Sequence, residues 1–328
     1  MANMDQTQLR LEEVKTKHPT SLQAHRKGVR VNKTLEAKTG FTPLQPFLKW
    51  AGGKRALLPE LRARTPEYSG TYIEPFLGAG ALFFDQDPTR LKIVSDFNRD
   101  LVDVYLTIKN DLQSLLRELN SHENSADHYY AVRAWDREQE WEELSPVKKA
   151  ARFIFLNKTN YNGLYRVNSS GQMNVPFGGQ RRPDWIQAPL LEAINEFLNF
   201  KNINGIETTK IMCANYSEIT ALAKQGDWVY LDPPYAGTFT DYQSGGFSDD
   251  DQTLVRDEAL RLTEIGVPVL LSNSDVKLIH DLYGDKKHRK YFKVEPVEVK
   301  RYIGANIASR GSTTEVMISN YRYLGIKV

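Results

Sequence analysis

The chain has 328 residues, of which 41% are hydrophobic and 26% charged, a composition typical of a globular protein large enough for more than one core. It contains no run of 18 apolar residues, and its N-terminus lacks the apolar segment of a secretory signal, so neither a membrane helix nor secretion is predicted. The single cysteine, Cys213, excludes an internal disulfide, and the scattered histidines give no metal-binding pattern.

The net charge of +2 is unevenly distributed. Residues 111–145 hold nine acids and three basic residues, a net of −6, whereas residues 145–185 hold seven basic residues and one acid, a net of +6. Residues 286–301 hold seven basic residues and two acids, a net of +5. Alternating basic and acidic stretches favour a polyanion such as nucleic acid as a partner, with solubility and local ion pairing as the alternative.

Residues 1–45 are polar, mildly basic and without periodicity, so we expect a flexible extension, with ordered structure beginning near Pro46. The segment "TYIEPFLGAGALFF" then predicts a strand, a loop starting at Glu74 and a helix. Gly78 and Gly80 in that loop allow the backbone to approach a ligand closely.

"LKIVSDFNRD" predicts a second strand ending at Asp96, followed by a helix that is capped by Asn98 and has one apolar stripe over residues 101–119. Asp96 lies 22 residues after Glu74, about the separation at which an acid binds the hydroxyls of a ribose. Phe83 replaces the third glycine of a dinucleotide-binding motif, and "AGGKR" lacks the first glycine and the Ser/Thr of a phosphate-binding loop. A nucleoside cofactor without phosphates is therefore favoured.

Residues 120–200 have a different character, because "FIFLNKTNYNGLYRVNSSGQMNVPFGG" is rich in asparagine, aromatic and basic residues and "SSGQ" is typical of a hairpin turn. We expect an insertion into the sheet domain here. Beyond it we predict strands at 228–231 and 267–272, a helix at 249–265 and a last strand at "EVMISNYRY". The alternation of strands and helices predicts a doubly wound α/β sheet.

"WVYLDPPY" joins a buried strand to a rigid polar loop. Asp232 follows the strand directly, at the edge where open α/β sheets bind ligands. Its carboxylate and the carbonyl of Pro233 can accept the two hydrogens of an amino group, and Tyr235 can stack on the ring that carries the group. The two prolines fix this arrangement, which predicts catalysis by positioning an exocyclic amine. An ordinary proline turn after a strand is the alternative.

The blocks "FLKWAGGKRALLPEL", "YIEPFLGAGALFF", "VSDFNRDLVDVY", "LNKTNYNGLYRVNSSGQMNVPFG", "VYLDPPY" and "VLLSNSD" resemble, in this order, those of the Dam-type (D12 class) DNA adenine methyltransferases. The resemblance extends from about Pro46 to Tyr323. It implies a doubly wound methyltransferase sheet, S-adenosylmethionine as methyl donor, and N6 of adenine in duplex DNA, within GATC, as acceptor. We accordingly expect a catalytic domain of residues 46–110 and 200–328, and an inserted helical and hairpin target-recognition domain of residues 111–199.

The motifs and the resemblance together assign roles to individual residues. The residues expected to be catalytic are Asp232, Pro233 and Tyr235. Those expected to bind DNA are Tyr161, Asn162 and Arg166 of "NYNGLYR", with a phosphate contact as the alternative for Arg166 and the core as the alternative for the neighbouring Leu164. Those expected to bind the cofactor are Trp50, Lys54, Glu74, Phe76, Gly78, Asp96 and Asp232, with Lys54 as the partner of the donor's carboxylate. No metal site is expected.

Double-stranded DNA is the expected partner, without membrane association, and a cognate restriction endonuclease acting on the same site is a further expectation. We expect a cytoplasmic monomer that is associated with the nucleoid through DNA. Three alternatives stay open: methylation of cytosine N4 or of another amide or amine, an inactive DNA-binding relative, and a dehydrogenase. Intact Asp96 and Asp232 oppose a loss of activity, and Phe83 opposes a dehydrogenase.

Overall fold

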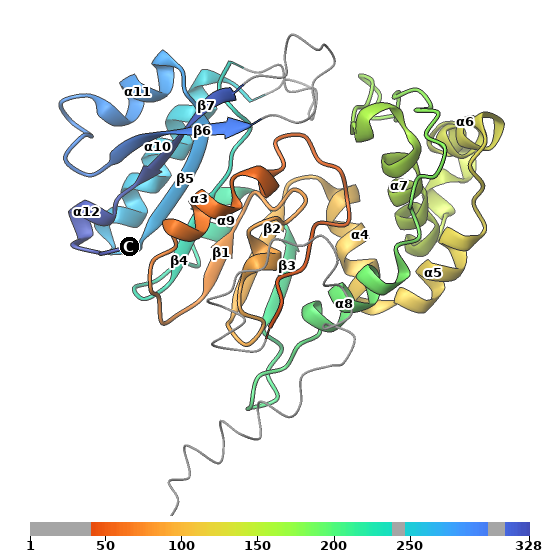
Figure 1. Cartoon of the computed structure of the whole chain (residues 1–328), viewed down its shortest axis with the longest axis horizontal. Helices are drawn as coiled ribbons and strands as arrows, with labels where there is room; N and C mark the ends of the chain where they lie inside the picture. The colour runs from red at the N-terminus through yellow and green to blue at the C-terminus, as the bar shows by residue number, and fades with distance from the viewer. Residues whose placement is uncertain (1–40, 238–246, 301–311) are drawn as a thin grey trace, which may run out of the picture.

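The computed structural model describes residues 41–237, 247–300 and 312–328, and its centre is a mixed seven-stranded sheet in the order β3-β2-β1-β4-β5-β7-β6 (Figure 1). The strands are β1 (Tyr72–Glu74), β2 (Lys92–Asp96), β3 (Thr209–Cys213), β4 (Trp228–Leu231), β5 (Val269–Ser274), β6 (Lys293–Lys300) and β7 (Ser312–Ser319). Strands β1 to β5 are parallel, and β7 pairs antiparallel with β5 and β6. The α/β sheet predicted from the sequence is confirmed.

Helices cover the sheet and build the segment between β2 and β3 (Figure 1). The described α-helices are α3 (Leu58–Ala63), α4 (Arg99–Asn110), α5 (Leu112–Asn120), α6 (Ala126–Ala134), α7 (Pro146–Thr159), α8 (Ala188–Leu198), α9 (Tyr216–Thr220), α10 (Asp249–Glu264), α11 (Lys277–Gly284) and α12 (Tyr321–Leu324). The described 3₁₀ helices are η2 (Lys54–Ala56), η3 (Phe83–Asp85), η4 (Trp135–Arg137), η5 (Gln139–Glu143) and η6 (Tyr161–Gly163). In the described ranges, no helix combines the length and the apolar character needed to cross a bilayer.

Strand β4 shows why the sheet is covered on both faces. Trp228 and Tyr230 belong to one hydrophobic core and Val229 and Leu231 to a second, because successive side chains of a strand alternate between its two faces. All four side chains are fully buried. The uninterrupted apolar run "WVYL" is therefore the pattern of a central parallel strand that contacts helices on both sides.

The strand order reverses between β1 and β4. From β1 the chain builds outward to β2 and β3, whereas from β4 it builds outward to β5. Glu74 is the last residue of β1, and Asp232 immediately follows β4, so both carboxyls stand at the same edge of two paired strands. Open α/β sheets bind ligands in the crevice at such a reversal.

Three predicted elements differ from those observed. The apolar stripe over residues 101–119 is divided between α4 and α5, because Asp111 leaves the helical conformation and accepts a hydrogen bond from the amide of Ser114 at the start of α5. The helix predicted after the glycine loop is only the short η3. The predicted last strand ends at Ser319. The rest of the predicted segment is Asn320 and the first three residues of α12.

Two strands escaped prediction, β3 and β6, and both are the edges of the sheet. Strand β3 is mostly half-exposed and so lacks the apolar run of a central strand. Strand β6 contains Pro296 and alternating charges, which are typical of an edge and weaken a strand pattern.

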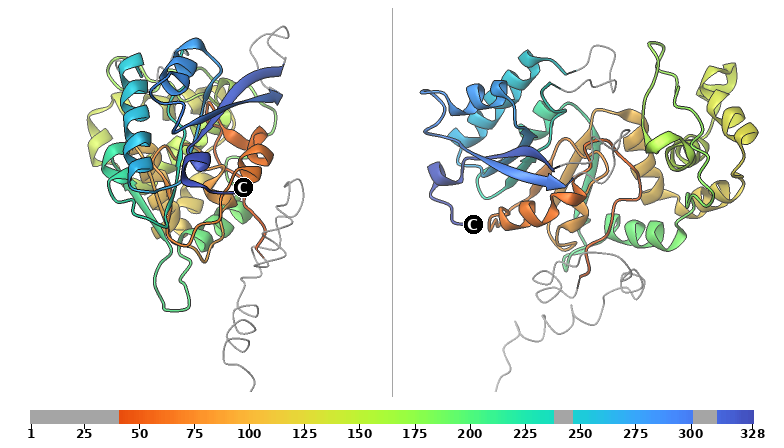
Figure 2. Two further views of the ribbon diagram at one scale, coloured as in Figure 1. Left: turned by 90° about the vertical axis from the view of Figure 1, so that its left-hand side faces the viewer. Right: turned by 45° about the horizontal axis from the view of Figure 1, so that its top comes forward.

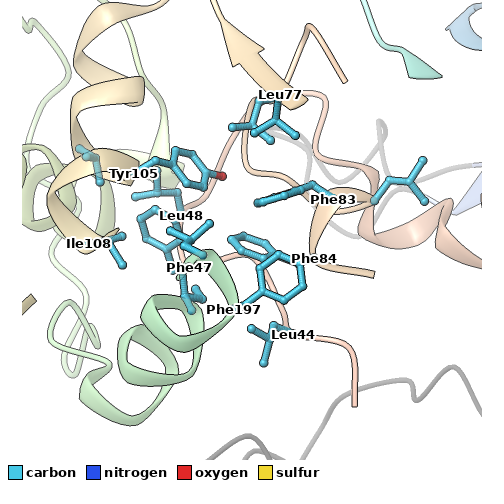
Figure 3. Packing of buried hydrophobic residues seen from close by; sticks show 14 of the residues in the cluster. Leu44, Phe47, Leu48, Leu77, Phe83, Phe84, Tyr105, Ile108 and Phe197 are labelled. Atoms are coloured by element: carbon cyan, nitrogen blue, oxygen red, sulfur yellow. The ribbon is translucent and has the colours of Figure 1, made fainter. Parts of the chain in front are cut away.

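Much of the segment between β2 and β3 lies to one side of the sheet (Figure 2), and this segment carries a hydrophobic cluster of its own. The buried members of this cluster are Tyr129, Val132, Phe155, Leu156, Met173 and Val175. The expected hairpin is present as an isolated antiparallel pairing of Val167 with Met173. Helix α8, which the expected boundary at residue 199 assigns to the insertion, packs in the sheet core, where Phe197 contacts Phe83 and Phe84 (Figure 3).

The expected start of ordered structure, near Pro46, is too late. Phe41 and Leu44 are 1% and 4% exposed, and both belong to the sheet core. Phe41 packs on Phe197 with ring centroids 5.8 Å apart, and Leu44 lies beside Phe84 (Figure 3). Residues 41–45 therefore belong to the folded domain, while the rest of the predicted flexible extension lies outside the described residues.

Replacing Leu44 by alanine should lower the free energy of unfolding by about 2–5 kcal/mol, because the lost methyl groups leave a cavity in a packed core. Urea denaturation of both proteins measures the difference. Ile203→Ala, at a position that is 68% exposed, is the control and should change stability by no more than about 0.5 kcal/mol. Equal effects of the two substitutions would contradict the assignment of residues 41–45 to the core.

Candidate active site

Asp232 carries the chemistry at the end of β4, and its two carboxylate oxygens have different surroundings. Oδ1 lies 2.8 Å from Nζ of Lys54 and accepts a hydrogen bond of 2.7 Å from the hydroxyl of Ser272. Oδ2 accepts no hydrogen bond from the part of the chain that the structure describes. The carboxylate is thus fixed through one oxygen and presents the other to a ligand.

A chain of hydrogen bonds supports this orientation. The hydroxyls of Tyr230 and Ser272 are 2.8 Å apart, and because Ser272 donates its hydrogen to Asp232, Tyr230 must donate to Ser272. Burial raises the pKa of Asp232, and the ammonium of Lys54 acts against that shift. The side chains of Lys54 and Asp232 are only 7% and 16% exposed, so removing one of them would leave the other charge largely buried and unpaired.

The proline loop after Asp232 is held from the neighbouring strand and helix. The side chain of Gln252 in α10 donates to the carbonyl of Pro234 at 2.7 Å. Asn273 in β5 accepts from the amide of Ala236 at 3.0 Å and donates to Gln252 at 2.9 Å. The carbonyl of Pro233 accepts nothing from the described residues and, like Oδ2 of Asp232, is available to a ligand.

Two contacts hold the side chain of Tyr235, one at its hydroxyl and one at a face of its ring. Its hydroxyl donates to the carboxylate of Glu315 in β7, and Nζ of Lys54 lies 4.5 Å from the centre of its ring. The ammonium covers one face of the ring in a cation–π contact. Lys54 also donates to the carbonyl of Gly52 at 2.6 Å, and therefore joins the Asp232 carboxylate, the Tyr235 ring and its own loop.

The glycine loop and Asp96 form a second part of the site. The amides of Gly78 and Asn98 each donate to a different oxygen of Asp96, both at 2.9 Å. Each carboxylate oxygen keeps a lone pair for another donor, which suits the neighbouring hydroxyls of a ribose. Phe97 is 60% exposed directly after Asp96 and offers a ring on which a base can stack. Buried Phe83 and the absence of an α-helix immediately after the loop fit a nucleoside rather than a pyrophosphate.

Trp50 lies between the glycine loop and the inserted segment. Gly78 has a φ of +50°, and a Cβ there would come within 3.0 Å of the Trp50 ring, so this close approach requires glycine. The ring of Trp50 also packs on the rings of Tyr165 and Phe153, whose centroids lie 5.3 and 6.1 Å from its own. Phe76 lies elsewhere, stacked on Tyr216 of α9 at 5.2 Å.

Glu74 is almost completely buried at the end of β1, where it accepts a hydrogen bond of 2.7 Å from the hydroxyl of Tyr72. Burial raises its pKa well above the ordinary 4.5, and the nearby carboxyls of Asp232 and Asp96 raise it further, whereas Tyr72 and Lys54 lower it. Burial also raises the pKa of Asp96. Glu74 therefore lies within electrostatic reach of Lys54 and of two other carboxyls, those of Asp232 and Asp96.

The predicted DNA-binding residues lie on the inserted segment and form what we call the recognition turn, residues 161–166. Tyr161 and Leu164 are 48% and 37% exposed, so Leu164 is not a core residue. Asn162 adopts a left-handed conformation with φ +57°. Nε of Arg166 donates to the side chain of Asn174 at 2.7 Å, which orients the guanidinium. The structure thus places Lys54, Glu74, Asp96 and Asp232 at the sheet edge, and it packs the recognition turn against Lys49 and Trp50.

Motif analysis missed the residues that hold Asp232 and its loop in place: Ser272, Asn273, Gln252 and Glu315. Only "SNS" at the end of a predicted strand gave a signal, because small polar side chains there stand beside the ligand site of the neighbouring strand. Gln252 and Glu315 come from a helix and an antiparallel strand, and no sequence spacing connects them to Asp232.

The sequence that builds this site matches a known protein family. The family model of the D12 class N6 adenine-specific DNA methyltransferases matches residues 50–303. The type II methyltransferase M1.LlaDCHI of Lactococcus lactis subsp. cremoris is 39% identical over 285 residues, covering 85% of this chain and 96% of the relative. The type II methyltransferase M.MjaIII of Methanocaldococcus jannaschii is 35% identical over 85% of this chain and 99% of its own length. A DNA adenine methylase of Escherichia coli K12 is 33% identical over 83% and 93%.

Titration of Glu74 should be measurable as a change in stability. Its pKa is raised above 4.5 in the folded protein, so the folded state holds the proton more tightly than the unfolded chain does, and stability is lost as pH rises from 4.5 toward the folded-state pKa. Gln at this position keeps an acceptor for Tyr72 and cannot ionise. We expect the free energy of unfolding of E74Q to exceed that of wild type by an amount that grows as the pH rises above about 5.

Urea denaturation at a series of pH values measures this difference. Glu207 is the control, because its pKa is lowered by Lys109 and E207Q should not gain stability over wild type as pH rises. A difference between E74Q and wild type that is independent of pH would show that Glu74 does not titrate as its burial requires.

Proposed function

Because the chain belongs to the D12 class of N6 adenine-specific DNA methyltransferases, we propose that it methylates the adenine of GATC sites in duplex DNA after rotating the base out of the helix. Membership confirms the resemblance found in the motifs and makes the chain an adenine-specific DNA methyltransferase. It also implies a DNA substrate and a methyl donor of the S-adenosylmethionine type. The target sequence, the base rotation and the residue roles below belong to the proposal.

The observation that carries the proposed mechanism is the pair of unoccupied acceptors, Oδ2 of Asp232 and the carbonyl of Pro233. N6 of adenine is a poor nucleophile because its lone pair is delocalised into the ring. Asp232 and Pro233 each accept one N6 hydrogen, which holds the nitrogen in one orientation and weakens that delocalisation. In a direct in-line transfer, the bond from N6 to the methyl carbon would form as the bond from that carbon to the donor's sulfur breaks, and N6 would release one hydrogen as a proton, which the Asp232 carboxylate can accept. The enzyme would contribute mainly by positioning the reacting atoms.

Base rotation follows from the location of the acceptors. Adenine in a duplex presents N6 in the major groove, so N6 reaches acceptors at a sheet edge only after the base leaves the stack. Rotation costs a few kcal/mol. Stacking of the rotated base on the Tyr235 ring would offset part of that free energy.

The residues around Asp96 fit the proposed donor. When bound, S-adenosylmethionine supplies a methyl group made electrophilic by a sulfonium. Asp96 would accept hydrogen bonds from the ribose, Phe97 would stack on the base, and Trp50 with Gly78 would form another wall of the site. We retain Glu74 and Phe76 as support of this loop.

Lys54 has a second candidate role. The sequence assigned it to the carboxylate of the donor, and that assignment stays a prediction. Its ammonium already contacts Asp232, Gly52 and the Tyr235 ring, and the geometry favours a role in holding Asp232 ionised. An ionised Asp232 is the form that accepts a hydrogen from the substrate amine.

The inserted segment is the proposed target-recognition domain. Arg166 donates from Nε and Nη2 to the side chain and the carbonyl of Asn174, at 2.7 and 3.5 Å, which leaves Nη1 and the second hydrogen of Nη2 to donate to O6 and N7 of a guanine. Tyr161 and Asn162 are exposed beside it and can contact the neighbouring bases. Support for GATC comes from the family resemblance of the segment "NYNGLYRVNSSGQMNVPFG". We also propose that the enzyme is a monomer, that it associates with the nucleoid, and that it acts beside a cognate endonuclease. Two relatives named type II methyltransferases support the presence of the endonuclease.

Changing Asp232 to alanine should reduce turnover by at least about 10²-fold while the affinity for DNA is retained, since the lost acceptor acts on the reacting nitrogen. Methyl transfer to a GATC duplex from a labelled donor gives turnover, and a gel-shift titration gives DNA affinity. Ser272→Ala is the comparison variant: it weakens the support of Asp232 by one hydrogen bond to Oδ1 but leaves Oδ2 in place, so its turnover should fall less than that of D232A. Retention of more than about a tenth of wild-type turnover by D232A would overturn the proposed role.

Changing Arg166 to alanine should cost about 1–3 kcal/mol and relax the preference at one base pair. Methylation rates on GATC and on duplexes with each position substituted, for wild type and variant, measure this. An equal loss on every duplex would assign Arg166 to a phosphate instead. If the wild-type enzyme showed no preference for GATC, the proposed target itself would be wrong.

A further inference from the structure

Asn157 is an almost completely buried amide in the last turn of α7, 2% exposed, and it connects two segments that are distant in the sequence. Its Oδ1 accepts from the amide of Lys49 at 2.9 Å, and its Nδ2 donates to the carbonyl of Lys49 at 2.7 Å. The same Nδ2 donates to the carbonyl of Gly163 at 3.2 Å. One side chain therefore holds both backbone groups of residue 49 and one backbone group of the recognition turn.

The segment that begins at Lys49 carries side chains of the candidate active site. Trp50 follows directly and packs against Gly78 of the glycine loop. Lys54 follows four residues later and contacts Asp232 at 2.8 Å. A displacement of the Lys49 backbone is therefore transmitted over a few covalent bonds to groups beside the proposed cofactor site and beside the reacting acceptor.

A second contact joins the same two segments. A Cβ at Gly163 would lie 2.2 Å from Cδ and 2.5 Å from Cβ of Lys49, so the turn packs directly on the Lys49 side chain and only glycine fits there. The conformation of Gly163, with φ +67°, also requires glycine. Tyr165, at the far side of the turn, packs on Trp50 with ring centroids 5.3 Å apart. The recognition turn and the segment of residues 49–54 thus contact each other directly at two places and are bridged at a third by Asn157.

We propose that Asn157 is a positioning residue that couples DNA binding at the recognition turn to cofactor binding at the sheet edge. When the turn engages its target, Gly163 is held in one position, and through Asn157 the backbone of Lys49 is held with it. Trp50 and Lys54 are then ordered for the cofactor and for Asp232. The inference rests on the proposed function only in giving the turn a role in DNA binding.

The physical basis is the low dielectric around a buried, fully satisfied amide. A hydrogen bond there resists separation because no water replaces the lost partner, so the two segments move together or not at all. Coupling between two sites is a free energy and acts in both directions, typically as a factor of about 5–150 in affinity. A purely structural asparagine would lower stability when removed but would leave the ratio of affinities unchanged.

The test measures binding rather than turnover. Calorimetry gives the dissociation constant of S-adenosylhomocysteine for the full-length enzyme, alone and in complex with the duplex that the wild-type enzyme methylates fastest. For wild type we expect DNA to tighten this binding by about fivefold or more. In Asn157→Ala the tightening should fall below about twofold, whereas binding in the absence of DNA changes little and the DNA complex still forms.

Asn160→Ala is the matched control. Asn160 is equally buried at the end of the same helix and donates to the carbonyl of Leu164 in the turn at 2.6 Å, but it makes no hydrogen bond to Lys49. Its removal disturbs the turn without cutting the link, so the coupling factor should stay within about twofold of wild type. If Asn157→Ala does not fold, Asn157→Asp takes its place in the same measurement. An aspartate keeps the acceptor for the Lys49 amide but cannot donate to the carbonyls of Lys49 and Gly163.

Wild-type coupling below about twofold, an unchanged factor in both Asn157 variants, or an equal loss in Asn160→Ala would each overturn the proposal. These outcomes are separate from a failure of the proposed function. A preference for a sequence other than GATC, or a phosphate role for Arg166, changes the duplex that is used but not the comparison between Asn157 and Asn160.

Discussion

The buried ion pair between Lys54 and Asp232 is the interaction on which the arrangement of the site depends. Taking both charges out of water is unfavourable, and the pair is stable only if Asp232 receives further hydrogen bonds and Lys54 is delivered in the correct orientation. Ser272 supplies the first condition from β5. The second condition, the delivery of Lys54, depends on the segment before β1. Phe41 and Leu44 anchor the start of that segment in the core. Packing far from the reaction therefore fixes a charge at its centre.

The same ion pair gives Asp232 its asymmetry. One oxygen is used for structure and the other is left for the substrate, so a single carboxylate is both held and available. The neighbouring prolines keep the carbonyl of Pro233 in register with it, while Gln252 and Asn273 use the remaining polar groups of the loop. The site resembles a preorganised hydrogen-bonding surface, in which the protein does not rearrange at the moment of reaction.

The inserted segment is joined to the sheet domain in two ways. It has a small core of its own, and its helices α5, α7 and α8 also pack in the sheet core. Asn157 and the stacked rings of Trp50, Phe153 and Tyr165 add contacts to the segment before β1. Apolar packing holds the two parts together, and a buried amide with three partners fixes their relative position, because its hydrogen bonds are directional.

The sequence by itself determined what depends on local pattern. The run "WVYL", the cap at Asn98 and the rigid "DPPY" follow from periodicity, side-chain chemistry and proline geometry, so the central strands, the site edge and Asp232 were predictable. Tertiary structure alone decided which residues meet across the chain. Edge strands β3 and β6 carry no two-faced apolar run, and the partners of Asp232, Tyr235 and Lys49 come from segments 40 to 178 residues away. Such contacts are selected by the burial of whole elements, and no spacing in the sequence encodes them.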